Sequence, residues 1–300
     1  MRTTMNRTLL LVTGLFLTGS TVEGQDRGAA QGQRQPALLQ DYVAFTVTAP
    51  PAELELHPFC RKYVDAHGIP VVSSEKVPDA ALLAARDIVQ FMLSERPDLR
   101  HELIRKRWKL AIMAETEVTY DIPEHRQYRL LPEIDDERLT EEQRARYYEP
   151  GGVGTMTGEQ YWNVRGRGFG GEPDGENTTS CAEENLLGYP GTCYFGSSIC
   201  VHEFSHGIMR GAIYTVDPDY RDAVVAAYTA AKQAELPTAV GYNGNNFNEH
   251  WAGGIEAYTR SNGRTPAWLV EADPRLYELV RQMIPARRMP GNVFVDRPRR

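Results

Sequence analysis

The 300-residue chain lacks three features that would place it in common classes of protein. It has no apolar run of the ~20 residues needed to span a bilayer, no internal repeat, and no basic cluster apart from the closing DRPRR at 296–300, which we expect to be a solvated tail. The formal net charge is −7. Since nucleic acid binding needs positive charge, we expect neither a nucleic acid partner nor stable membrane insertion.

The N-terminal segment has the layout of a secretory signal peptide. Arg2 and Arg7 precede an apolar run at 9–17, and small residues follow up to Gly24. This layout predicts export to a secreted, periplasmic or extracellular location, with residues 1–24 removed and a net charge of −8, because those residues carry two arginines against Glu23. Residues 25–40, rich in Gln, Gly and Ala, are predicted to be a disordered leader, and 41–300 a single domain.

Cysteine is also scarce, and its spacing is informative. No two of the four cysteines have the C-x-x-C spacing that zinc sites with thiolate ligands usually show. An even number in an exported chain favours disulfides. Among the three possible connectivities we favour Cys181 with Cys193, which would close a loop rich in Gly and Pro, and Cys60 with Cys200.

The hydrophobic pattern predicts an α+β fold. An apolar stripe of helical period runs from Ala81 to Met92, with Asp79 near its start, and Pro97 separates it from a second short helix. The segment 108–120, WKLAIMAETEVTY, is the best strand candidate, and 121–175 is mainly loop with one helix at 139–148. Helices are then expected at 197–211, 217–235, 247–261 and 274–284. Strands early and helices late favour α+β over a wound parallel sheet.

The sequence HEFSH at 202–206 predicts a metal site. Two histidines four residues apart lie on one face of a helix, so His202 and His206 can present ring nitrogens to one ion. Ser197 and Ser198 are candidate N-caps, Gly211 is a candidate helix end, and the core face is Val201, Phe204 and Ile208. Glu203 can reach a water on the ion and act as general base. The alternative is an ordinary helix with two histidines that bind nothing.

A catalytic zinc needs a third protein ligand and an open fourth position. The residues after His206 rule out a third histidine of the H-E-x-x-H-x-x-G-x-x-H kind. Further along, Glu249, His250 and Glu256 lie on one predicted helix. Glu249 is near the N-terminal turn of that helix and His250 lies about a quarter turn away, so both cannot be the first choice.

HEFSH together with YNGNNFNEHWA at 242–252 resembles the zinc peptidases of the anthrax lethal factor type, which include the Pro-Pro endopeptidases. The resemblance implies a zincin-like peptidase domain with a small mixed sheet, an active-site helix and a helical C-terminal half. It implies His202, His206 and Glu249 as zinc ligands, Glu203 as base, and Tyr242, seven residues before Glu249, as the residue that stabilises the oxyanion. Substrate would lie along an edge strand, for which 108–120 is the candidate, with the 181–193 loop as one wall.

One position departs from that family. A second Glu often follows the ligand by four residues and supports a ligand histidine, but Gly253 stands here. Glu256 is a possible replacement, although the sequence favours a solvated surface position for it. The main expectation is an exported zinc metallopeptidase acting on a peptide or protein. The alternatives are a zinc-containing binding module with weak or no catalysis, and a zinc hydrolase of non-peptide amides or esters.

Overall fold

The computed structural model describes residues 46–136, 139–173 and 177–290. The predicted signal peptide at 1–24, the predicted leader at 25–40 and the basic tail at 296–300 lie outside these residues. Among the helices that are described, none is both long and apolar enough to cross a membrane.

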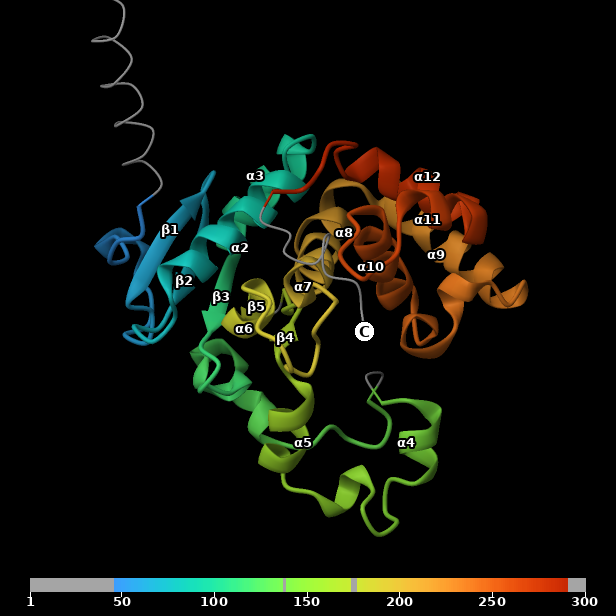
Figure 1. Ribbon diagram of the computed structural model, residues 1–300, viewed down its shortest axis with the longest axis horizontal. Helices are drawn as coiled ribbons and strands as arrows, with labels where there is room; N and C mark the ends of the chain where they lie inside the picture. Colours follow the sequence, from blue (N-terminus) through green and yellow to red (C-terminus); the bar gives the residue numbers. More distant parts are fainter. Residues whose placement is uncertain (1–45, 137–138, 174–176, 291–300) are drawn as a thin grey trace, which may run out of the picture. The chain divides into compact units, whose positions relative to one another are not determined.

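The described strands form one mixed sheet in the order β1-β2-β3-β5-β4 (Figure 1). Strands β2, β3 and β5 are parallel, whereas the outer pairs β1/β2 and β4/β5 are antiparallel. The strand bounds are β1 (Lys62–Ala66), β2 (Ile69–Ser73), β3 (Lys109–Met113), β4 (Gly168–Phe169) and β5 (Thr178–Ala182).

The strand expected at 108–120 is confirmed only over Lys109–Met113, as β3, and its expected place at the sheet edge is wrong. Strand β3 lies between β2 and β5, and the edge strand on the β5 side is β4. Leu110 and Ile112 are buried on one face of the sheet, and Ala111 and Met113 are buried on the other. A continuous apolar run of this kind is typical of a central parallel strand covered on both sides.

The helices confirm most of the expected helical segments. The sequence did not predict α6 (Glu183–Leu186), α8 (Tyr214–Val216) or α11 (Pro266–Ala272), nor the short helices within 121–175 other than α4 (Glu141–Ala145). The helix bounds are α2 (Asp79–Met92), α3 (Pro97–Arg105), α4 (Glu141–Ala145), α5 (Gly158–Arg165), α6 (Glu183–Leu186), α7 (Ile199–Ile208), α8 (Tyr214–Val216), α9 (Pro218–Gln233), α10 (Phe247–Tyr258), α11 (Pro266–Ala272) and α12 (Pro274–Met283). Shorter turns are η1 (Ala52–Leu54), η2 (Thr119–Asp121), η3 (Pro123–Arg129), η4 (Val153–Thr155), η6 (Pro237–Ala239) and η7 (Gly241–Gly244), and η5 (Met209–Ile213) is π-helical.

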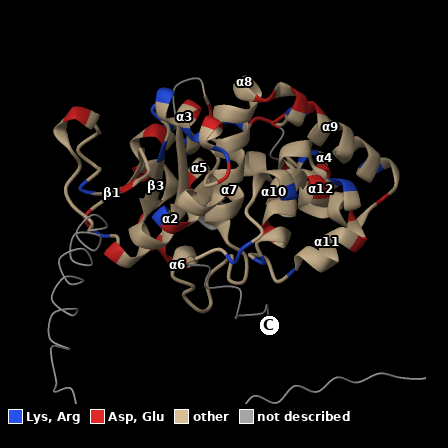
Figure 2. Cartoon of the chain, turned by 90° about the horizontal axis from the view of Figure 1, so that it is seen from above, with Lys and Arg blue, Asp and Glu red and all other residues tan. Residues whose placement is uncertain are grey.

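Helix α7 lies at the centre of the packing. It contacts β5 on one side and α10 on another, and α9 to α12 are grouped beyond it (Figure 1). Its residues Val201, Phe204 and Ile208 are fully buried, as expected, in the same core as α2 and one face of the sheet. Figure 2 shows charges of both signs on outer elements such as α3 and α9, while α7 is mostly uncharged. The observed class is α+β, with α9, α11 and α12 packed around α10, which in turn packs against α7.

The predicted end of the metal helix at Gly211 is wrong. Helix α7 continues without a break into η5 and α8. Gly211 lies inside this run. A Cβ at this position would lie 2.5 Å from Leu103 and 2.8 Å from Trp108. The glycine therefore allows close packing of the helix and does not terminate it.

The predicted disulfides are wrong, since no disulfide joins any of the four cysteines, all of which lie in the described part of the chain. Cys60 and Cys200 belong to cores on opposite faces of the sheet. The neighbour of Cys181 is Cys200 on α7, with which its thiol makes a hydrogen bond. Burial, the larger cause, and this contact, the second, raise the pKa of Cys181 well above its usual range. Cys193 is exposed in the loop before α7.

Helix α7 approaches the sheet closely at Gly207. A Cβ at this position would lie 2.3 Å from the Thr179 hydroxyl oxygen on β5. That hydroxyl accepts a hydrogen bond from Trp108 Nε1 at 3.0 Å and donates one to the Gly170 carbonyl at 2.9 Å, so it is held in place.

We predict that Gly207→Ala destabilises the fold by about 1–3 kcal/mol, because the methyl group overpacks this seam. Helix propensity alone would favour alanine by about 1 kcal/mol, so the two effects have opposite signs. Urea unfolding measures the change. Thr179→Ala serves as the paired control, because Gly207→Ala should cost less once the hydroxyl is gone. Equal or greater stability of the single variant would contradict close packing here.

Candidate metal centre

The start of α7 is fixed by two polar residues. The side chain of Ser198, one of the two expected caps, accepts a hydrogen bond from the Val201 amide at 3.4 Å. Asn185 of α6 accepts from the Ile199 amide at 2.8 Å and donates to the Ser197 carbonyl at 2.8 Å. These contacts satisfy amides that a helix N-terminus leaves without partners. The first turn of α7, which carries the metal motif, is therefore anchored to the α6 segment.

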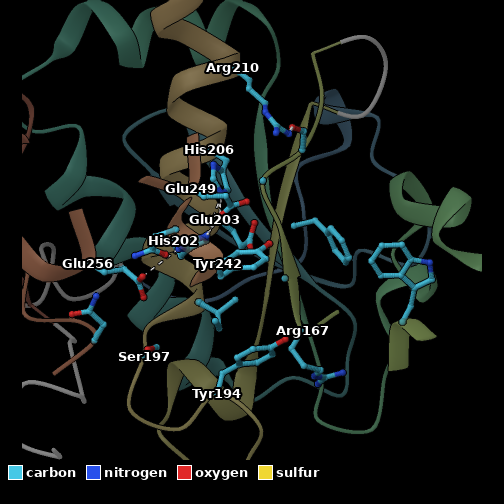
Figure 3. A pocket seen from close by; sticks show the side chains of 18 of the residues that line it. Arg167, Tyr194, Ser197, His202, Glu203, His206, Arg210, Tyr242, Glu249 and Glu256 are labelled. Carbon is cyan, nitrogen blue, oxygen red and sulfur yellow. Dashed lines mark hydrogen bonds and ion pairs between the residues drawn. The ribbon is translucent and has the colours of Figure 1, made fainter. Parts of the chain in front are cut away.

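Glu249 is brought to α7 by the first turn of α10. Asn246 caps that helix by accepting hydrogen bonds from the Asn248 and Glu249 amides, both at 3.0 Å. Glu249 Oε2 then lies 2.9 Å from His202 Nε2 and 3.5 Å from His206 Nε2, and the two Nε2 atoms are 3.1 Å apart. Figure 3 shows these side chains converging between the two helices.

The geometry of these three residues fits a zinc ion. One ligand atom from each lies within 4.8 Å of the other two. Around a zinc ion with bonds of about 2.1 Å, tetrahedral ligands stand about 3.4 Å apart, so small outward shifts would admit the ion. Two imidazoles and one carboxylate are also ligands that zinc accepts in catalytic sites.

The electrostatics favour a positive charge at the same point. Burial alone would lower the pKa of His202, but its hydrogen bonds with Glu249 and Glu256 raise this pKa well above its usual value. Burial would raise the pKa of Glu249, yet the charge of His206 and the hydrogen bonds from both histidines hold it far below the usual range. The carboxylate is therefore ionised beside the two rings, as a metal ligand must be.

Glu256 supports His202 from the other side of its ring, and its expected solvated surface position is wrong. The residue is buried, and His202 Nδ1 donates to Glu256 Oε2 at 3.2 Å. A carboxylate in this position fixes the orientation of a ligand histidine and increases its basicity. His206 differs, since its Nδ1 has no hydrogen-bond partner among the described residues. The position of Glu256, two turns after Glu249 on the same helix face, was the signal in the sequence.

His250 is not a ligand in this arrangement. It is fully buried, and its Nε2 lies 3.0 Å from Asp273 Oδ2 and 3.3 Å from Thr238 Oγ1. Asp273 also caps α12 by accepting from the Leu276 amide at 2.9 Å. His250 therefore links α10 to the start of α12 and has a structural role.

Glu203 and Tyr242 lie beside the ligand group and line the same cleft (Figure 3). Glu203 is partly buried, and this burial raises the pKa of its carboxyl group. Tyr242 is 45% exposed, and its ring centroid lies 6.4 Å from that of His202. The five residues that the sequence singled out are thus brought together, with a candidate base and a tyrosine lining the same cleft.

The cleft has a volume of about 950 Å³. One wall is formed by β4 and the residue after it. Gly168 of β4 and Gly170 just beyond it lie close to α7: a Cβ at 168 would lie 3.0 Å from Glu203 Cγ, and one at 170 would lie 2.3 Å from His206 Cβ. Phe169 between them stacks on Tyr128, with ring centroids 3.9 Å apart, and both rings also line the cleft. The two glycines let an edge strand lie directly across the metal helix, which the sequence analysis missed because β4 has only two residues.

Two cleft-lining arginines hold the walls of the cleft together. Arg167 donates from Nε to Glu184 Oε1 at 2.7 Å and from Nη2 to Glu184 Oε2 at 2.9 Å. Arg210, on the π-helical turn after α7, forms an ion pair with Glu172, which follows β4. The expected contribution of the 181–193 loop to the cleft is not seen, although Tyr194 and Ser197, which come just after it, do line the cleft.

We predict that Glu256→Ala weakens zinc binding by about 10- to 100-fold, the usual effect of losing a supporting carboxylate. Glu256→Gln should weaken it less, because its amide oxygen can still accept from His202 Nδ1. Competition with a chromophoric chelator measures the affinity. Glu271→Ala, which removes an exposed carboxylate on α11, is the control for the change in charge. Unchanged affinity in Glu256→Ala would contradict the supporting role.

Comparisons with known proteins returned no relative. No protein-family model matches the chain, and no curated protein or solved structure matches it. The resemblance to zinc peptidases of the lethal factor type therefore rests on the motif residues, and the function has to be inferred from the geometry of the site.

Proposed function

We propose that this protein is a zinc-dependent metallopeptidase that hydrolyses peptide bonds, and that it is exported. The observation that carries the proposal is the convergence of His202, His206 and Glu249 within 4.8 Å, in a cleft that Glu203 also lines. The resemblance of 202–206 and 242–252 to lethal factor-type peptidases supports it. The N-terminal pattern Arg2, Arg7 and the apolar 9–17 supports export.

Each residue has a defined chemical task in this proposal. Zinc, held by His202, His206 and Glu249, would supply a Lewis acid that activates water and polarises the substrate carbonyl. Glu203 takes a proton from the attacking water and passes it to the leaving amine. Its raised pKa suits this exchange, because a base that must later act as an acid works best with a pKa near the working pH. Tyr242 donates a hydrogen bond to the oxygen that gains charge, a contact worth about 3 kcal/mol.

The shape of the cleft favours a polypeptide as substrate. A volume of about 950 Å³ is at the upper end of pockets that hold small molecules. Strand β4 is the last strand of the sheet, and its Gly168 lies close to the candidate base Glu203; an extended chain can add to a free sheet edge of this kind by main-chain hydrogen bonds. This geometry supports peptides over small amides or esters.

The non-catalytic alternative loses its main support. It was favoured by Gly253, which stands where a carboxylate that supports a ligand histidine was expected. Glu256 occupies that role from three residues further along α10. A binding module would also not need the partly buried Glu203 beside the ligands.

We predict that Glu203→Gln abolishes peptide cleavage, by at least about 10²-fold, while zinc content stays at the wild-type value. The amide keeps the shape of the side chain but cannot accept the proton. Cleavage of a fluorogenic peptide library and metal analysis of the same samples measure the two effects. Glu172→Gln is the control, since Glu172 lines the same cleft but contacts Arg210 instead of the ligands.

The outcomes separate the three functions. Cleavage lost with zinc retained supports the peptidase. If the zinc-loaded wild type cleaves no peptide of a broad library but hydrolyses ester or non-peptide amide probes, the peptidase proposal is wrong and the other hydrolase is supported. If it binds zinc and cleaves neither class, the binding module is supported.

A further inference from the structure

The turn that carries Tyr242 is held unevenly. At its C-terminal end, the Gly244 carbonyl accepts a hydrogen bond from Tyr228 at 2.8 Å, and Gly244 packs so closely on Ala239 that a Cβ would lie 2.4 Å from the Ala239 carbonyl oxygen. At its N-terminal end, Gly241 has a φ of 59°, and a Cβ there would meet nothing within 4 Å. Tyr242 follows this open end and is itself 45% exposed. A contact that holds this turn against α10 therefore also positions Tyr242.

Asn243 makes that contact with α10. Its side-chain amide lies on Gly253: a Cβ at 253 would be 2.2 Å from Asn243 Nδ2, 2.8 Å from Cγ and 3.1 Å from Oδ1. Real Cβ atoms do not approach other heavy atoms so closely, so the amide occupies the space of a residue 253 side chain. Any larger residue at 253 must displace Asn243.

Gly253 also lies between the two functional carboxylates of α10. Glu249, Gly253 and Glu256 are spaced by four and three residues, so they share one face of the helix. Glu249 contacts both histidines, and Glu256 contacts His202 from the other side of its ring. Asn243 is therefore seated on the helix face that holds the metal ligands, and it connects the Tyr242 turn to that face.

We propose that Gly253 is a positioning residue for Tyr242: it forms a seat for Asn243, which fixes the turn 241–244 over the metal site. The inference rests on the proposed function in the sense that the task of Tyr242 belongs to the peptidase reaction. It also explains why the supporting carboxylate stands at 256, since a glutamate at 253 would fill the seat. Glycine destabilises the helix at this position relative to alanine, but it leaves the space in which Asn243 holds the turn.

The seat and helix propensity predict opposite results for Gly253→Ala. Propensity alone predicts a more stable helix with unchanged activity. Expulsion of Asn243 instead loosens the turn and lowers kcat on the order of 10- to 100-fold, with KM and zinc content little changed, because the loss falls on transition-state stabilisation. The same loss is expected for Tyr242→Phe, and combining the two should add little.

The decisive experiment compares wild type, Gly253→Ala, Asn243→Ala and the double variant Asn243→Ala/Gly253→Ala. Hydrogen–deuterium exchange of the metal-free proteins should rise at 241–245 in both single variants and should stay unchanged in the core of α7. In the double variant the new methyl group fills the space of the lost amide, so exchange and kcat should recover relative to Gly253→Ala. Asn243→Ala tests the same contact from the turn, so the test survives if Gly253→Ala does not fold.

Two results would overturn the seat: wild-type exchange at 241–245 in both single variants, or a double variant whose kcat loss equals the product of the single losses. The exchange measurement needs neither metal nor substrate. A wild type that cleaves no peptide therefore refutes the proposed function and leaves the seat to be judged on exchange alone. The variant Gly253→Glu is one further test. It should lower kcat, whereas a higher kcat would show that a carboxylate is tolerated at 253 and would contradict the proposed role of Gly253 as a seat for Asn243.

Discussion

The contacts of two α10 carboxylates with one imidazole of α7 are the interaction on which the rest of the site depends. Glu249 and Glu256 contact opposite nitrogens of the His202 ring, at 2.9 Å and 3.2 Å. Both carboxylates and the ring are buried, so each contact is made in surroundings where an unpaired charge would be costly. The pair of helices is thereby fixed in register, and His206 and Glu203 follow because they lie on the same helix as His202.

Glycines allow the neighbouring elements to reach this helix pair. Gly168 and Gly170 bring the edge strand β4 against Glu203 and His206, and Gly207 brings the Thr179 hydroxyl against the other side of α7. Each of these approaches is closer than a side chain would permit. The cleft therefore has a main-chain wall close to the candidate base, which is the requirement for holding an extended polypeptide beside it.

The buried polar groups of α10 divide into two sets with different tasks. Glu249 and Glu256 face α7, while His250 faces Asp273 and Thr238 and joins α10 to α12. This division explains how adjacent residues in the sequence NEHW serve a candidate metal site and the fold separately. It also accounts for the burial of an entire helix, 248–258, that carries two glutamates and a histidine.

The sequence by itself determined the local features: the helix with His202 and His206 on one face, its cap at Ser197 or Ser198, the apolar face at Val201, Phe204 and Ile208, and the α+β class. These follow from spacing along one element, which short-range geometry fixes. Only the tertiary structure decided the central position of β3, the approach of β4, the separation of Cys60 from Cys200 by the sheet, and the burial of Glu256. Each of these depends on which elements meet in space, and contacts between distant segments leave no period in the sequence.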